Sequence, residues 1–313
     1  KAFKAGFLKY ASKILKKLYF YFHHKKNKEH IDLNQKKFNT VGIGVTFSPN
    51  LKANICESAR LALLFKASLV LIHVGDASEE KRATFASYLD PFVKEGLLAS
   101  VVFNPGEPVR SILESVKQNG VDLLILGALQ RENFLKYYIG SIARKITRKA
   151  SCSVMLLINP SIKRLPCKHI VVNGLEDQKT PATISAAFFV AAALSSEKIT
   201  IVEEVSNTEV GNVQDDKSLR KSTLLKEKIS RREDSRIQKI LEEIPQNHKE
   251  KKLIATQPIF GKRGYSIGHY AEVVRADLLV MNAPKTSGFW DRLFPHDIEH
   301  ILTELPTDIL IVQ

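Results

Sequence analysis

The feature that most constrains this chain is a framework of residues that occurs twice, 155 positions apart. Asp122 recurs as Asp277, and the apolar run at 154–157 recurs at 309–312. A repeat of this length corresponds to a whole small domain, and the 313 residues of the chain are enough for two such domains. We therefore predict that one fold is used twice.

Each copy alternates short apolar runs with segments of helical periodicity. Runs that are apolar throughout and separated by helices indicate a parallel sheet covered by helices on both faces. In the first copy the predicted strands are 41–45, 67–74, 100–103, 121–126 and 154–158, and the predicted helices are 51–65, 78–96, 107–118 and 140–149. In the second copy the predicted strands are 169–172, 198–205, 253–256, 278–281 and 308–312, and the predicted helices are 181–194, 264–275 and 297–304. The predicted domains are residues 38–160 and 165–313.

The second copy carries a charged insertion at about 206–252. If Asn173 is the counterpart of Thr46, the two positions are 127 residues apart, so 28 extra residues precede the third strand of this copy. Apolar residues recur at helical spacing within the insertion, which favours one long, mostly exposed helix; they are Leu225, Ile229, Ile237, Ile240 and Ile244. A disordered loop is the alternative.

The net charge of +14 is concentrated at the start of the chain. Residues 1–40 contain eleven lysines against two acidic residues. The remainder is therefore nearly neutral, which argues against a nucleic-acid surface on the globular part. Three cysteines at unrelated positions, Cys56, Cys152 and Cys167, give no metal-binding spacing, so no metal site is expected.

The first 37 residues have the pattern of a basic amphipathic helix followed by a polar connector. Apolar residues three or four positions apart fall on one helical face, at Phe3, Phe7, Ala11, Ile14, Leu18 and Phe22. Such a helix suits an anionic membrane surface. The alternative is a helix that docks on the domain or is ordered only in parts. No apolar run in the chain is long enough to cross a bilayer.

The stretch most suggestive of ligand binding runs from Gly127 to Ser141. A buried strand ends at Gly127, and Gly140 and Ser141 begin a helix. Backbone N–H groups can converge in such an arrangement, which suits a phosphate. The alternative is that Ser141 only caps the helix. The second copy has Asn282 at the place of Gly127, and 295–296 reads Pro-His, so this loop is kept only in the first copy.

This stretch resembles the signature of the universal stress protein family, which is Gly, two residues, Gly, nine residues, then Gly-Ser or Gly-Thr. The spacing is intact, and Gln130 replaces the middle glycine. The resemblance covers 38–158 well and extends to 168–313 through the repeat. It implies two tandem Rossmann-like domains of the adenine nucleotide alpha hydrolase-like type, each with a five-stranded parallel sheet. It also implies that the two final strands pair with each other, as a pseudo-dimer inside one chain.

The family contains members that bind ATP or AMP and members that do not. The resemblance implies a nucleotide site in the first copy, formed by Thr46, Ser48, Val74, Gly127, Gln130, Arg131, Gly140 and Ser141. Nucleotide-binding members have an aspartate at the end of the first strand, where this chain has Thr46 and, in the second copy, Asn173. Neither side chain offers a carboxylate. We therefore expect a weakened site in the first copy and a lost one in the second.

No catalytic constellation is visible: there is no GxSxG motif and no Walker lysine. The prediction is a non-enzymatic regulatory or sensor module. Family members are fused to transporters, and the chain begins with lysine rather than methionine. We therefore expect a fragment that forms the cytoplasmic tail of a transporter, held at the inner face of the membrane by residues 1–37. The alternatives are a freestanding stress-response scaffold, which could form homodimers, and a slow ATP hydrolase.

Overall fold

The computed structural model describes residues 38–130, 137–138, 140–206, 215–261, 264–283, 301–302 and 304–313. Residues 36–313 form one compact unit. The predicted amphipathic helix at 1–37 and most of the predicted helix at 297–304 lie outside the described residues. The predicted domain boundaries stay predictions. The segments 38–160 and 165–313 are called the first half and the second half below.

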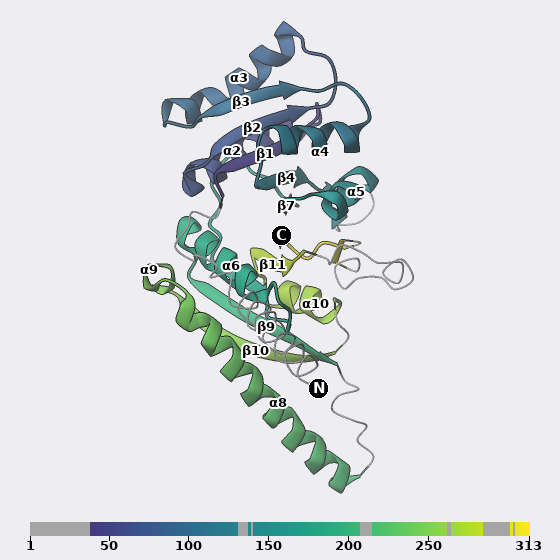
Figure 1. Ribbon diagram of the computed structural model, residues 1–313, viewed down its shortest axis with the longest axis vertical. Coiled ribbons are helices and arrows are strands. Elements are labelled where there is room, and N and C mark those ends of the chain that lie inside the picture. Colours follow the sequence, from purple (N-terminus) through teal and green to yellow (C-terminus); the bar gives the residue numbers. More distant parts are fainter. Residues whose placement is uncertain are drawn as a thin grey trace, which may run out of the picture. The chain divides into compact units, whose positions relative to one another are not determined.

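Ten described strands form one sheet in the order β10-β9-β8-β11-β12-β7-β4-β1-β2-β3 (Figure 1). The first half contributes β1 (Thr40–Val45), β2 (Ser68–His73), β3 (Ala99–Phe103), β4 (Leu123–Gly127) and β7 (Ser153–Leu157). The second half contributes β8 (His169–Asn173), β9 (Lys198–Ser206), β10 (Leu253–Gly261), β11 (Leu278–Asn282) and β12 (Asp308–Val312). Within each half, these ten strands pair only in parallel. The predicted fold of two Rossmann-like halves is confirmed.

The two halves meet where β7 pairs with β12 in antiparallel register, with Leu156 opposite Ile309. Polar contacts flank this seam in symmetric positions. The Ser153 hydroxyl accepts a hydrogen bond from the Gln313 amide at 3.2 Å, and the Asp308 carboxylate accepts one from the Ile158 amide at 2.8 Å. The internal pseudo-dimer predicted from the final strands is therefore present.

The described helices connect these strands in the order expected of a doubly wound sheet. They are α2 (Leu51–Phe65), α3 (Glu79–Lys94), α4 (Pro108–Gln118), α5 (Ser141–Lys149), α6 (Thr180–Leu194), α8 (Asp216–Glu243), α9 (Gln246–Lys249) and α10 (Ser266–Val273). Helix α2 packs on α3, and α4 packs on α5. A short hairpin, β5 (Leu129–Gln130) with β6 (Tyr137–Tyr138), lies in the stretch predicted as a loop.

The repeated aspartate has a structural role in both halves. Asp122 accepts hydrogen bonds from the amides of Asn39 and Thr40, at 2.8 and 3.2 Å. Asp277 accepts the equivalent bonds from residues 168 and 169, at 2.7 and 2.9 Å. Each carboxylate thus ties the start of a fourth strand to the start of a first strand. This explains why the sequence repeats an acidic residue next to an apolar run.

The strand register corrects the predicted alignment of the two halves. Val41 pairs with Leu123 just as Ile170 pairs with Leu278, so the first strands are 129 positions apart. The counterpart of Thr46 is therefore Leu175, and the prediction that Asn173 stands there was wrong by two residues. A match between polar residues at strand ends ignores hydrogen-bond register, which only the paired strands define.

Nearly all the extra residues of the second half lie between β9 and β10. The pairings place Leu69 opposite Ala99 and Ile199 opposite Ile254, so the second strands are 130 positions apart and the third strands 155. Helix α8 therefore occupies the connection that α3 occupies in the first half. The long helix predicted in this charged segment is present. Its start is fixed by Asp215, whose carboxylate accepts a hydrogen bond from the Ser218 amide at 2.7 Å.

Candidate functional site

A cavity of about 610 Å³ lies at the carboxyl ends of β1, β2 and β4. In a doubly wound sheet, ligands bind outside the carboxyl ends of the strands, where the strand order reverses. Here β1 is the reversal point, because its neighbours are β2 on one side and β4 on the other. The topology alone therefore makes this edge of the first half the expected site.

Six of the eight predicted site residues line this one cavity, namely Thr46, Ser48, Val74, Gly127, Gly140 and Ser141. They come from the ends of three strands and the start of α5. Gln130 lies in β5, and Arg131 lies outside the described residues. Sequence reasoning did not single out two further lining residues, Asn54 and His73.

The first turn of α5 faces the cavity, since residues 140–143 all contribute to its wall. Gly140 occupies the N-cap position and no side-chain hydrogen bond caps the helix there; its first turn contains no acidic residue. Ser141 is the first helical residue, so the alternative that it caps α5 was wrong. The first amides of a helix have no partner within the helix and carry its positive dipole end. This arrangement suits an anionic group.

Gly127 forms part of the floor of the cavity. A Cβ atom at this position would lie 3.1 Å from both amide atoms of Asn54, a contact tighter than most real side chains make. The Asn54 Oδ1 atom is buried and has no hydrogen-bond partner among the described residues. The packing of Asn54 on the α-carbon therefore disfavours a side chain at this position, which is a structural reason independent of any ligand.

His73 ends β2 at the cavity and is 7% exposed. Its Nδ1 atom lies 3.2 Å from the carbonyl oxygen of Val45 at the end of β1. Its ring packs edge-on against Phe47, Phe85 and Phe103, with centroids 5.6, 5.9 and 5.7 Å away. His73 therefore joins two strand ends and gives the wall a rigid aromatic backing. The only sequence signal for this role was a polar residue at the end of an apolar run.

The cavity walls carry hydroxyl, amide and imidazole groups but no aspartate or glutamate among the described lining residues. A bound anion would meet no like charge from these described walls. The same walls hold no acid–base pair and no described lysine or arginine, so the arrangement is able to hold a ligand but offers no general acid or base apart from His73. Among the residues that the structure describes, no cluster of His, Cys, Asp and Glu could hold a metal ion.

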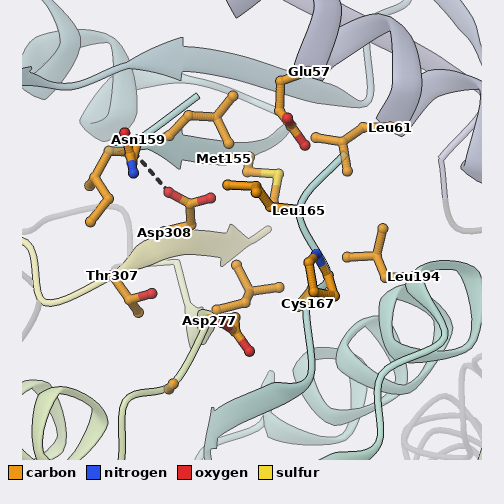
Figure 2. A pocket seen from close by; sticks show the side chains of 15 residues that line it. Glu57, Leu61, Met155, Asn159, Leu165, Cys167, Leu194, Asp277, Thr307 and Asp308 are labelled. Atoms are coloured by element: carbon orange, nitrogen blue, oxygen red, sulfur yellow. Dashed lines mark hydrogen bonds between the residues drawn. The ribbon is translucent and has the colours of Figure 1, made fainter. Parts of the chain in front are cut away.

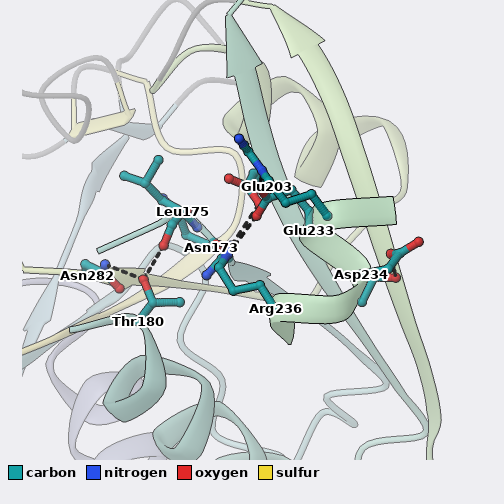
Figure 3. A network of polar contacts seen from close by, with 11 residues as sticks. Asn173, Leu175, Thr180, Glu203, Glu233, Asp234, Arg236 and Asn282 are labelled. Carbon is teal, nitrogen blue, oxygen red and sulfur yellow. Dashed lines mark hydrogen bonds and ion pairs between the residues drawn. The ribbon is translucent and has the colours of Figure 1, made fainter. Parts of the chain in front are cut away.

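At the corresponding edge of the second half, described side chains of the chain itself bond to the strand ends (Figure 3). Arg236 of α8 donates hydrogen bonds to the carbonyl oxygen of Gly174 and, at 2.8 Å, to Glu203. Asn282 donates to the Thr180 hydroxyl at 3.2 Å, and that hydroxyl donates to a backbone carbonyl after β8. Polar groups at the ends of β8, β9 and β11 are thus bonded to one another.

Two glutamates distinguish the second half at the end of its second strand. By strand register, Glu203 and Glu204 take the places of His73 and Val74. Glu204 is 3% exposed and accepts hydrogen bonds from the amides of Gly264 and Ile267, at 2.9 and 2.8 Å. An internal carboxylate therefore occupies the start of α10, where an external anion would otherwise bind.

A second cavity, of about 260 Å³, lies at the seam between the halves (Figure 2). Three carboxylates border it, those of Glu57, Asp277 and Asp308. Desolvation raises the pKa of Asp308 to about 7, and the like charges of Glu57 and Asp277 add to the rise against the amide of Ile158. Burial also raises the pKa of Cys167 to about 12, so its thiol is inert at neutral pH. This acidic cavity is unsuited to an anion.

Comparison with known proteins agrees with this geometry. Residues 80–157 match the sequence profile of the Universal stress protein family. The chain carries a universal stress protein domain. Over 64 residues, 20% of its length, it is 27% identical to "Universal stress protein YxiE" of Bacillus subtilis (strain 168), and this match spans 43% of that relative.

Two solved structures share the fold of both halves. A universal stress protein from Archaeoglobus fulgidus DSM 4304 is 13% identical, with a TM-score of 0.59, over 88% of this chain and 98% of that one. The cytoplasmic domain of a prokaryotic cation chloride cotransporter is 12% identical, with a TM-score of 0.51, over 87% and 94%. At these identities the likeness concerns the fold. No helix among the described residues is long and apolar enough to span a bilayer.

Proposed function

We propose that this chain is a non-enzymatic regulatory module of the universal stress protein type, whose first half binds an adenine nucleotide, ATP or AMP, weakly. The observation that carries the proposal is the cavity that joins the uncapped start of α5 to the ends of β1, β2 and β4. Its volume of about 610 Å³ lies within the range of small-molecule sites, roughly 300–1,000 Å³.

The proposed roles follow from the position of each group. The amides of Gly140 and Ser141 would receive phosphate oxygens, as helix starts do in other nucleotide sites. The hydroxyls of Thr46 and Ser48 would contact the ribose, and Val74 would contact the base. Affinity would be low because the described walls offer no carboxylate for ribose hydroxyls and no cation for phosphate.

Titration calorimetry of the full chain with ATP and AMP tests this proposal. Gly140→Asp places a carboxylate at the start of α5 and should weaken nucleotide binding at least about tenfold, the scale of one lost charge-assisted contact. Gln118→Glu adds the same charge at an exposed position on α4 and should leave affinity unchanged. Absence of heat with both nucleotides would instead favour the scaffold that binds no nucleotide, and nucleotide-dependent phosphate release would favour the slow hydrolase.

We also propose that the chain works as the cytoplasmic tail of a transporter, at the inner face of the membrane. Support comes from its fold likeness to a transporter's cytoplasmic domain and from the basic amphipathic pattern of residues 1–37. Flotation of the full chain with anionic and neutral vesicles tests the membrane contact. Each lysine contributes about 1 kcal/mol near an anionic surface. Changing Lys9, Lys13, Lys16 and Lys17 together to glutamine should therefore reduce binding by roughly two to three orders of magnitude. The matched arginine variant should bind as the wild type does.

A further inference from the structure

A cluster of three charged side chains joins α8 to the sheet in the second half (Figure 3). Glu203 comes from β9, and Glu233 and Arg236 come from α8. The Arg236 guanidinium donates to Glu203 at 2.8 Å and to Glu233 at 2.7 Å. Glu203 is 8% exposed and Glu233 is 3% exposed, so both carboxyl groups are withdrawn from water.

The charges in this cluster do not balance if every group is ionised, because two buried carboxylates share one partly buried guanidinium. Arg232 contacts Glu233 at 2.7 Å, but 61% of its side chain is exposed and water screens its charge. Glu176, in the exposed turn after β8, adds negative charge rather than relieving it. An unpaired buried carboxylate is costly, so the arrangement is favourable only when one carboxyl group keeps a proton.

The pKa values of the two carboxyl groups differ, so the proton resides on one of them. Burial, together with the hydrogen bond to Glu233, raises the pKa of Glu203 to about 8 in spite of the nearby Arg236. Burial also acts to raise the pKa of Glu233, but hydrogen bonds from Glu203, Arg236 and Arg232 outweigh it and hold this pKa at about 2. Glu203 is therefore the protonated partner at neutral pH, and Glu233 is the ionised one.

We propose that Glu203, Glu233 and Arg236 form a proton-dependent latch that holds α8 over the carboxyl ends of β8 and β9. Arg236 also reaches the carbonyl oxygen of Gly174 at the end of β8, so the latch bridges both strands. In the first half, His73 stands in place of Glu203 and the same edge is open. Release of α8 would uncover the equivalent edge of the second half.

The direction of the pH effect follows from linkage. The pKa of Glu203 is about 8 in the closed state, against about 4.3 for a glutamate in water, so closing takes up a proton between these values. The latch is fully favourable below that window and weakens as the pH rises through it. The equilibrium constant for opening α8 should rise by at most about tenfold per pH unit.

Hydrogen–deuterium exchange of the full chain, measured from about pH 5.5 to about pH 7.5 and corrected for intrinsic exchange rates, tests the latch. Peptides from α8 should show an opening constant that rises at least about tenfold over this range. Peptides from α3 serve as the internal reference, because α3 makes the equivalent connection without a buried charge cluster. A constant ratio between α8 and α3 across the range would overturn the proposal.

Two variants sharpen the test. Glu203→Gln keeps the shape and the hydrogen bonds of the protonated side chain but cannot ionise, so α8 should lose its pH dependence and stay closed at the upper end. Glu227→Gln removes an exposed carboxylate on the same helix, paired with Arg231 at 2.5 Å, and should keep the wild-type dependence. A pH dependence that survives in Glu203→Gln would contradict the latch. The wild-type series decides the matter even if that variant does not fold.

Discussion

The two halves share one sheet topology but differ at the edge formed by the carboxyl ends of their strands. In the first half the ends of β1, β2 and β4 surround a cavity, and α5 begins there without a side-chain cap. In the second half Arg236 reaches the end of β8, and Glu204 binds the start of α10. Two residues at a strand end and one longer helix contribute to the difference. A duplicated fold can thus change a site without changing its strand order.

Removing Arg236, the cation at the carboxyl ends of β8 and β9, should have the largest effect on stability. Arg236→Met leaves Glu203 and Glu233 buried together without their guanidinium, and we expect a loss of about 3 kcal/mol in the free energy of unfolding. Urea denaturation measures it. Arg231→Met, on the same helix with 77% of its side chain exposed, should cost less than about 0.5 kcal/mol. Equal losses of unfolding free energy in the two variants would show that the charge cluster does not stabilise the second half.

Val74 and Glu204 occupy equivalent positions at the end of the second strand of each half. Exchanging these residue types should give each half a property of the other. Glu204→Val leaves the amides of Gly264 and Ile267 without an acceptor and should cost about 2 kcal/mol in urea denaturation. The reciprocal Val74→Glu places a carboxylate on the cavity wall and should abolish ATP binding in calorimetry. Unchanged binding in Val74→Glu would contradict the ligand position that we propose.

The seam offers a comparison between Asp308 and its symmetric partner Ser153. Because the pKa of Asp308 is raised in the folded protein to about 7, folding favours its protonated form and stability should fall as the pH rises from about 4 to about 7. Asp308→Ser copies the residue at Ser153 and should remove at least about 1–2 kcal/mol of that dependence. Thermal unfolding at several pH values measures it, and identical slopes would refute the assignment.

The smallest effect concerns the floor of the open cavity. Gly127→Ala should cost about 1 kcal/mol, because its Cβ would press on the Asn54 amide. Adding Asn54→Ala should restore most of this loss, since the two side chains compete for one space. In the second half the larger side chain is on the strand instead: Asn282 takes the place of Gly127, and Thr183 takes the place of Asn54. Denaturation of the double variant provides the check, and additive losses would argue against the contact.

The secondary structure was largely predictable from local pattern. Apolar runs separated by helical segments predicted all ten strands of the sheet, and several ends agree within one or two residues. Helix α8 followed from its apolar spacing. The β5–β6 hairpin was missed, because two-residue strands leave no periodic signal.

The candidate site was predictable only where backbone geometry determines it. Gly127, Gly140 and Ser141 were found because their spacing matches a family signature in which backbone groups meet a ligand. His73 and Asn54 were missed, since a lone polar residue beside an apolar run can have many structural roles. Glu233 and Arg236 were missed because charged residues in a charged helical segment are usually solvated. Glu203 was missed because it is a polar residue at the end of an apolar run, as His73 is.

The sequence by itself determined the duplicated α/β fold and the loss of the glycine-rich loop from the second copy, and its family resemblance implied the pairing of the final strands. Only the tertiary structure decided the register between the halves and which side chains close the second edge. The physical reason is range. Hydrophobic periodicity acts within one element, whereas a strand register and a buried ion cluster depend on groups brought together from distant parts of the chain.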